Sequence, residues 1–204
     1  PSKIKANQCG SCWSFTAVGT LEAAVRIRNG SIKVSSEQEL VLQHTSTNHL
    51  RVSNGCNGGS TNQTYKMLNT TKVYTFVTPN DFAQMKGNLT NQPISGDVDA
   101  SSWMNYAGGI FRLHNAGHNH TVIAVEYDIN GNWKIRNHWG TRWAAGYVWI
   151  AANNTVGGAC GVLSSPFIPN LFDCSHFYYL PMSLILGKQL GINTYDASLS
   201  CNLV

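Results

Sequence analysis

The feature that most constrains this chain is a cysteine-containing turn followed at once by an apolar pattern of helical period. The turn spans residues 8–15, and residues 16–28 carry apolar side chains at helical spacing. Asn29-Gly30 is a suitable end for that helix. The pattern therefore predicts that Cys12 lies where a loop turns into a helix. The positive end of the helix dipole favours the thiolate form of Cys12, which is the form that attacks a carbonyl carbon.

Five blocks of sequence together carry a family resemblance. They are Gln8-Cys9-Gly10-Ser11-Cys12-Trp13, Gly55-Cys56-Asn57-Gly58-Gly59, Asn119-His120-Thr121-Val122, Trp133-Lys134-Ile135-Arg136-Asn137-His138-Trp139-Gly140, and Ala159-Cys160-Gly161-Val162 with its continuation to Pro169. In this order they resemble the papain-like (C1-type) cysteine peptidases, whose active-site signature is Cys-Gly-Ser/Ala-Cys-Trp/Tyr. The resemblance covers residues 1–169, and residues 170–204 match nothing in that family.

The resemblance implies an α+β fold of two lobes with the active-site cleft between them. A helical lobe over residues 1–90 carries the nucleophile, and a β-barrel lobe over residues 91–169 carries a histidine and an asparagine. Residues 170–204 form a C-terminal extension of unknown role. The sequence itself predicts strands at 121–127, 133–137 and 146–151, and the resemblance implies a further strand at 92–100. It also predicts a second helix opened by the capping-box pair Ser36 and Glu39, and a short helix at 64–68.

The resemblance also assigns the catalytic roles. Cys12 is expected to be the nucleophile, and His120 to pair with it as imidazolium, to protonate the leaving amine and then to activate water. Asn137 is expected to orient the imidazole ring. Trp139 is expected to shield the hydrogen bond between His120 and Asn137 from water, and it is also expected to contact the substrate. The resulting activity is that of a cysteine-type endopeptidase that works through an acyl-enzyme.

The oxyanion hole is where the sequence departs most from the family. The family uses a glutamine six residues before the nucleophile, and that position holds Ala6, whereas Gln8 stands four residues before Cys12. Either a two-residue deletion brings Gln8 into this role, or the side-chain donor is lost. Loss of one such donor typically slows catalysis about 10²–10³-fold. The alternative function is therefore a weak or inactive papain-like homologue that acts as a binding protein.

The cysteines allow several arrangements. The resemblance implies a disulfide between Cys9 and Cys56, and it leaves Cys160 without its usual partner. Cys174 and Cys201 either pair with each other, or one of them pairs with Cys160. A zinc site is a further alternative, because its ligand types would be present in Cys9, Cys12, His114 and His118. The implied disulfide with Cys56 would, however, occupy Cys9. We therefore expect neither a metal nor a cofactor.

Specificity is expected to come from the walls of the cleft. Gly58 and Gly59 can offer their backbone to an extended substrate, because glycine permits close approach. The resemblance places Asp97 and Ser165 in the pocket for the second residue before the scissile bond, with Asp97 replacing a small apolar residue.

Two orientations of Asp97 are open from the sequence. The carboxylate either faces that pocket and favours Arg or Lys in the substrate, or it points into the barrel beside Arg112 or Arg142. A shift of one residue in strand register would exchange the two.

Composition and motifs bear on location and partners. The net charge of +4 is small and dispersed, so we expect no nucleic-acid partner. The sequence contains no apolar run of about 18 residues, so we expect no membrane-spanning helix. Asn-x-Ser/Thr sequons begin at Asn29, Asn62, Asn69, Asn88, Asn119 and Asn153. They favour a lysosomal, vacuolar or secreted protein, and Asn119, beside His120, is not expected to carry a glycan.

The resemblance also implies protein or peptide substrates, inhibition by a propeptide or by cystatin-like proteins, and a monomer. The family is made as a secreted zymogen. The chain shows no signal peptide or propeptide, so the sequence predicts a processed or truncated product.

Overall fold

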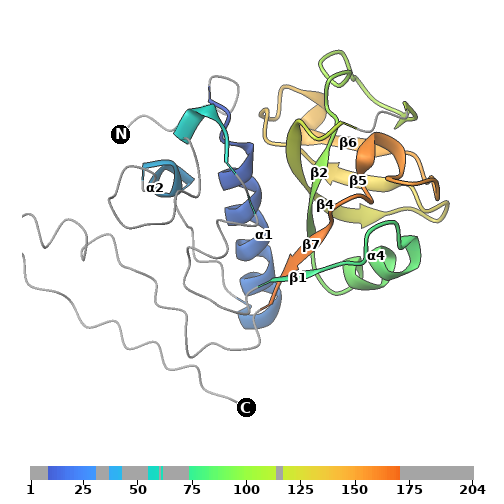
Figure 1. The fold of residues 1–204 in the computed structure, drawn as a ribbon, viewed down its shortest axis with the longest axis horizontal. Coiled ribbons are helices and arrows are strands. Elements are labelled where there is room, and N and C mark those ends of the chain that lie inside the picture. The colour runs from blue at the N-terminus through green and yellow to red at the C-terminus, as the bar shows by residue number, and fades with distance from the viewer. Residues whose placement is uncertain are drawn as a thin grey trace, which may run out of the picture.

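The computed structural model describes residues 9–30, 37–42, 55–59, 61, 74–113 and 117–170. Figure 1 shows a long helix, α1, standing beside a β-rich body. The fold class is α+β, as the sequence predicts. The positions of Gln8, Ser36 and His114, the expected helix at 64–68 and the extension beyond Asn170 lie outside the described residues.

Helix α1, Cys12–Asn29, begins and ends where the sequence predicts. Gly30 adopts φ 70°, the left-handed conformation that glycine tolerates best, and its N–H donates to the carbonyl of Arg26 over 2.9 Å. One face of α1 packs Trp13 and Val18 against the short helix α2, Glu37–Leu42. Burying apolar side chains on several faces fixes this helix between its neighbours.

The β-rich body contains a sheet of seven strands in the order β1-β7-β2-β4-β5-β6-β3 among the described residues. The strands are β1 Tyr74–Phe76, β2 Ile94–Val98, β3 Ile110–Phe111, β4 His120–Tyr127, β5 Trp133–Arg136, β6 Tyr147–Ile150 and β7 Phe167–Pro169. All neighbouring pairs are antiparallel except β3 with β6. Short 3₁₀ turns lie at Gly55–Asn57, Ala144–Gly146 and Ala159–Gly161.

The β-rich body also contains a helix, α4 (Phe82–Leu89), which was missed from the sequence. Its signal was Asp81, whose carboxylate accepts the Gln84 N–H over 2.8 Å as an N-cap. Met85 and Leu89 of α4 are buried in the same core cluster as the sheet residues. The predicted lobe boundary at residue 90 stays a prediction, although residues 82–89 pack with the β-rich body.

Helix α1 meets the sheet through a close and partly polar contact. Thr16 Oγ1 donates to the carbonyl of Thr121 over 2.9 Å, and the hydroxyls of Thr20 and Ser95 lie 2.8 Å apart. A Cβ at Gly19 would lie only 2.8 Å from Ile123 Cδ1, so the absence of a side chain allows the close approach. These contacts hold α1 against β2 and β4.

Among the described residues, no helix combines the length and the apolar character that a membrane span requires.

Candidate active site

The turn before α1 is held by covalent and backbone contacts. Cys9 and Cys56 form a disulfide, as the resemblance implies. The Gly10 N–H donates to the carbonyl of Cys56 over 2.7 Å, and a Cβ at Gly10 would lie 2.8 Å from that oxygen. Any larger residue would therefore displace the turn. The result is that Cys12 is the first residue of α1, with a free and partly exposed thiol.

His120 and Asn137 are brought together by the antiparallel pairing of β4 with β5. His120 begins β4, Asn137 directly follows β5, and His120 Nε2 lies 2.9 Å from Asn137 Oδ1. The backbone of Asn137 is itself fixed, because its N–H donates to the carbonyl of Gly146 over 2.9 Å. Burial lowers the pKa of His120, and the hydrogen bond to Asn137 partly opposes that shift.

Three aromatic rings surround the imidazole of His120. The ring centroids of Trp139, Trp103 and His138 lie 5.2, 6.3 and 4.8 Å from it. Trp139 thus stands beside the hydrogen bond that it was predicted to shield. These rings exclude water from a polar contact and restrict how far the imidazole can turn.

His138 directly follows Asn137, and no role was predicted for it from the sequence. Its ring stacks on Phe15 of α1 with centroids 5.6 Å apart, and its backbone N–H donates to Asn137 Oδ1 over 2.9 Å. Nε2 of His138 is buried and has no hydrogen-bond partner among the described residues. Burial, together with the charges of His120 and Arg136, lowers the pKa of His138 to about 3. His138 is therefore a neutral ring that fills the space between α1 and His120.

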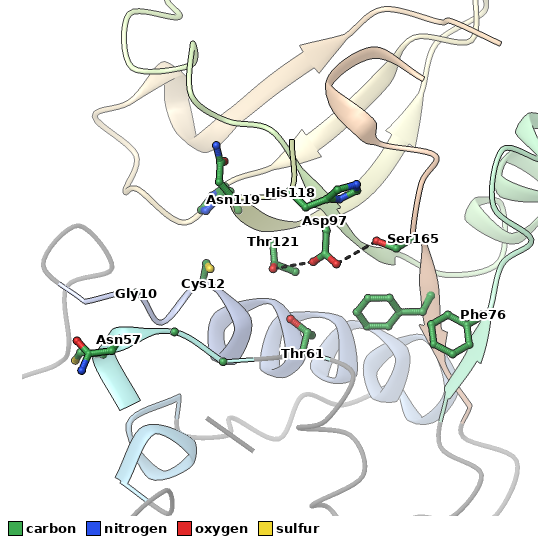
Figure 2. A pocket seen from close by; sticks show the side chains of 15 residues that line it. Gly10, Cys12, Asn57, Thr61, Phe76, Asp97, His118, Asn119, Thr121 and Ser165 are labelled. Carbon is green, nitrogen blue, oxygen red and sulfur yellow. Dashed lines mark hydrogen bonds between the residues drawn. The ribbon is translucent and has the colours of Figure 1, made fainter. Parts of the chain in front are cut away.

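A cleft of about 510 Å³ lies between α1, the Gly55–Asn57 turn and the sheet. Figure 2 shows Cys12 on one side of it and Asp97, Thr121 and Ser165 on the other. The cleft brings together most of the predicted site residues, namely Cys12, Gly58, Gly59, Asp97, His120 and Ser165. Trp139, predicted as a substrate contact, does not line it and packs on His120 instead. The sequence did not single out Thr61, Phe76 or Phe167, which also line it.

The sequence profile described as "Papain family cysteine protease" matches residues 2–78 and 67–170 of the chain. The chain belongs to this family.

Relatives of this papain-family protein support the same conclusion. Macrodontain-1 of Ananas macrodontes is 30% identical over 197 residues, which cover 80% of this chain and 89% of that protein. Human cathepsin O is 31% identical over 199 residues, covering 78% of this chain and 60% of the relative. The chain spans 56% of fruit bromelain of Ananas comosus.

Solved structures confirm the papain-like fold. The bromelain protease of Ananas comosus, solved in complex with the E64 inhibitor, superposes with a TM-score of 0.70 at 26% identity. The match covers 84% of this chain and 94% of that one.

Within this papain-family site, the carboxylate of Asp97 lies at the cleft and is held there by two hydroxyl groups. Thr121 Oγ1 and Ser165 Oγ donate to its two carboxylate oxygens, each over 3.0 Å. The single ion pair among the described residues joins Lys134 to Glu126, so neither Arg112 nor Arg142 neutralises Asp97. The carboxylate lines the cleft, and its effect on substrate preference stays a prediction.

Cys160 is free and buried. Its thiol lies 3.5 Å from the carbonyl of Leu113, and burial raises its pKa. Of the two arrangements left open from the sequence, the one that bridges Cys160 to a tail cysteine is not found, because Cys160 is a free thiol; Cys174 and Cys201 lie outside the described residues.

The alternative zinc site lacks one of its proposed ligands, because Cys9 forms a disulfide. Cys9 is bonded to Cys56 and cannot bind a metal through a thiolate. Of the other proposed ligands, His114 lies outside the described residues. The described part of the chain holds no group of three or more His, Cys, Asp or Glu side chains suited to a metal.

Asn119 is the sequon residue beside His120. Its Nδ2 donates to Asp99 Oδ1 over 3.1 Å and to Ser101 Oγ over 2.6 Å, and its Oδ1 accepts the Ala100 N–H over 2.9 Å. A glycan on Nδ2 would break at least one of these bonds. The structure thus gives a physical reason for the prediction that Asn119 carries no glycan, and the bonds help to fix the segment that enters β4.

Proposed function

We propose that this protein is a cysteine-type endopeptidase in which Cys12 is the nucleophile and His120 its proton partner. The observation that carries the proposal is the cleft itself. It holds a free thiol at the N-terminus of α1 together with an imidazole that Asn137 orients over 2.9 Å. Because Nε2 of His120 donates to Asn137, Nδ1 is the nitrogen that takes the proton of Cys12.

The reaction then proceeds through two stages. The Cys12 thiolate attacks the carbonyl carbon, and His120 gives its proton to the leaving amine, which leaves an acyl-enzyme. His120 next takes a proton from water, and hydroxide attack on the thioester releases the acid and restores the thiolate of Cys12 beside the imidazolium of His120. The backbone N–H of Cys12 supplies one oxyanion donor, and we assign the second to Gln8.

The electrostatic balance of the pair follows from its surroundings. Burial works against a charged imidazole and lowers the pKa of His120. A thiolate on Cys12 works in the opposite direction, because an adjacent negative charge stabilises the imidazolium. The proposed resting state is therefore an ion pair in which each charge stabilises the other.

Substrate contacts follow from the walls of the cleft. Gly58 and Gly59 line the cleft and leave open backbone for an extended peptide. At Gly58, where φ is 113°, an added Cβ would meet no atom within 4 Å. Ser165 holds Asp97 on the opposite wall. Protein or peptide substrates therefore fit the cleft. We propose a monomer that a propeptide or a cystatin-like inhibitor can block.

Location is also part of the proposal. The Cys9–Cys56 disulfide is typical of an oxidising compartment, since cytosolic thiols are kept reduced. This supports a lysosomal, vacuolar or secreted protein. Non-reducing peptide mapping of the protein from its native source tests the point, because a reduced Cys9 there would contradict it.

Covalent labelling with the inhibitor E-64 tests the activity, together with hydrolysis of internally quenched peptides. We expect label on Cys12 and turnover in the wild type, and neither in Cys12→Ala. Cys160→Ala removes the buried free thiol and is the matched control, which should keep both signals. A protein that takes no label and hydrolyses no peptide contradicts the proposal. Label without turnover supports the alternative, a papain-like homologue that binds peptides without cleaving them.

A further inference from the structure

Strand β2 presents alternate residues to two different environments. Ile94 and Val98 are fully buried in the core of the sheet, whereas the Ser95 hydroxyl lies 2.8 Å from that of Thr20 on α1. Because successive side chains of a strand point to opposite faces, Asp97 shares the face of Ser95. The carboxylate of Asp97 therefore points to the α1 side, where the cleft opens.

Two hydroxyl groups hold this carboxylate in place. Thr121 lies directly opposite Asp97 in the pairing of β2 with β4, and its Oγ1 donates to Oδ1 over 3.0 Å. Ser165 donates to Oδ2 over the same distance. Each carboxylate oxygen can accept a further hydrogen bond, because one donor uses only part of its lone-pair capacity. Figure 2 shows Asp97 held between Thr121 and Ser165.

The charge of Asp97 has no cationic partner within the described residues. The ion pair there joins Lys134 to Glu126, at a 2.9 Å separation. Thr121 and Ser165 supply orientation but no positive charge. A carboxylate that is oriented, partly buried and facing a substrate cleft is suited to a guanidinium or ammonium group brought by the ligand.

The neighbouring walls suit the rest of such a side chain. Phe76 is 53% exposed and lines the cleft with Phe167, the two ring centroids being 6.3 Å apart. Aromatic rings pack well against the methylene stem of arginine or lysine and attract its charged end. A purely aliphatic side chain would gain the same aromatic contact, but it would bury the Asp97 carboxylate without pairing it.

We infer that Asp97 is a specificity-determining residue that selects substrates carrying arginine or lysine, with the basic group on Asp97 and the stem against Phe76 and Phe167. The inference rests on the proposed function only in placing the substrate in this cleft. Arginine should gain more than lysine, because its planar fork can bond both carboxylate oxygens.

Kinetics on matched peptides measure the effect. Internally quenched peptides would carry arginine, citrulline or leucine in turn at each of the three positions before the cut. Citrulline keeps the shape of arginine and lacks its charge. At one position we expect kcat/KM for arginine to exceed that for citrulline by about tenfold to a hundredfold. Asp97→Asn should reduce that ratio below about threefold, whereas Glu126→Gln, which removes a surface carboxylate, should preserve it.

Equilibrium binding keeps the inference testable apart from catalysis. In the Cys12→Ala protein, fluorescence anisotropy compares the affinities of the arginine and citrulline peptides. We expect tighter binding of arginine, with a difference that shrinks as salt rises. Equal affinities in this protein overturn the inference even if E-64 labels wild-type Cys12. A preference for arginine supports it even if turnover is absent. Should Asp97→Asn fail to fold, Ser165→Ala offers a second variant. It should weaken the preference for arginine, because Oδ2 of Asp97 would lose the hydroxyl donor that orients the carboxylate.

Discussion

Replacing His138 by phenylalanine should remove much of the acid sensitivity of this fold. The ring of His138 stacks on Phe15 and lies 4.8 Å from the ring of His120, with Arg136 also acting on it electrostatically. These surroundings keep the imidazole neutral and lower its pKa to about 3. Phenylalanine keeps an aromatic ring at this position and removes both the titration and the buried Nε2 that lacks a partner among the described residues.

The sign and size follow from proton linkage. Below its unfolded pKa of about 6.5, His138 binds a proton in the unfolded chain but not in the fold. Its contribution to stability is therefore complete above pH 6.5 and is lost as the pH falls toward 3. Each pH unit costs about 1.4 kcal/mol, which is about 3.4 kcal/mol between pH 6.5 and pH 4. Part of the ring still contacts solvent, so we expect about 2 kcal/mol.

Urea unfolding at pH 7 and pH 4, followed by tryptophan fluorescence, measures this difference. The wild type should lose about 2 kcal/mol more of its free energy of unfolding between these pH values than His138→Phe. His118→Phe removes an exposed histidine and is the matched control, expected to behave like the wild type. If His138→Phe and the wild type lose the same free energy, the buried neutral imidazole is not a source of acid sensitivity and the reasoning is refuted.

Three further predictions concern the catalytic residues and the turn before α1. His120→Ala should abolish turnover almost as fully as Cys12→Ala. Asn137→Ala should retain measurable kcat, because Asn137 orients the ring without moving a proton. Equal losses of kcat in His120→Ala and Asn137→Ala would contradict these roles. Gly10→Ala should destabilise the fold by about 1–3 kcal/mol, because its Cβ meets a backbone oxygen at 2.8 Å; thermal unfolding checks this against Gly87→Ala, which has open space and should stabilise helix α4. Reducing agent should first raise activity by freeing an oxidised Cys12, but an excess should lower the Tm by opening the Cys9–Cys56 bridge; an unchanged Tm would show that the bridge contributes little.

Local chemistry made much of this protein readable from its sequence. The apolar spacing of residues 16–28 and the Asn29-Gly30 stop gave the helix and its end, because both depend on neighbours three or four residues apart. The strands around His120 and Trp133 were found for a similar reason, since apolar character between turns is a short-range signal. Family motifs then supplied the order of Cys12, His120 and Asn137.

Some features depended on partners distant in the chain and were decided only by the tertiary structure. The face of β2 that carries Asp97 is set by its pairing with β4 and its contact with α1, because a shift of one residue would turn the carboxylate into the core. The stacking of His138 on Phe15 likewise depends on residues brought together from separate elements. A sequence pattern states which residue types are present, but the direction of each side chain follows from what packs against it.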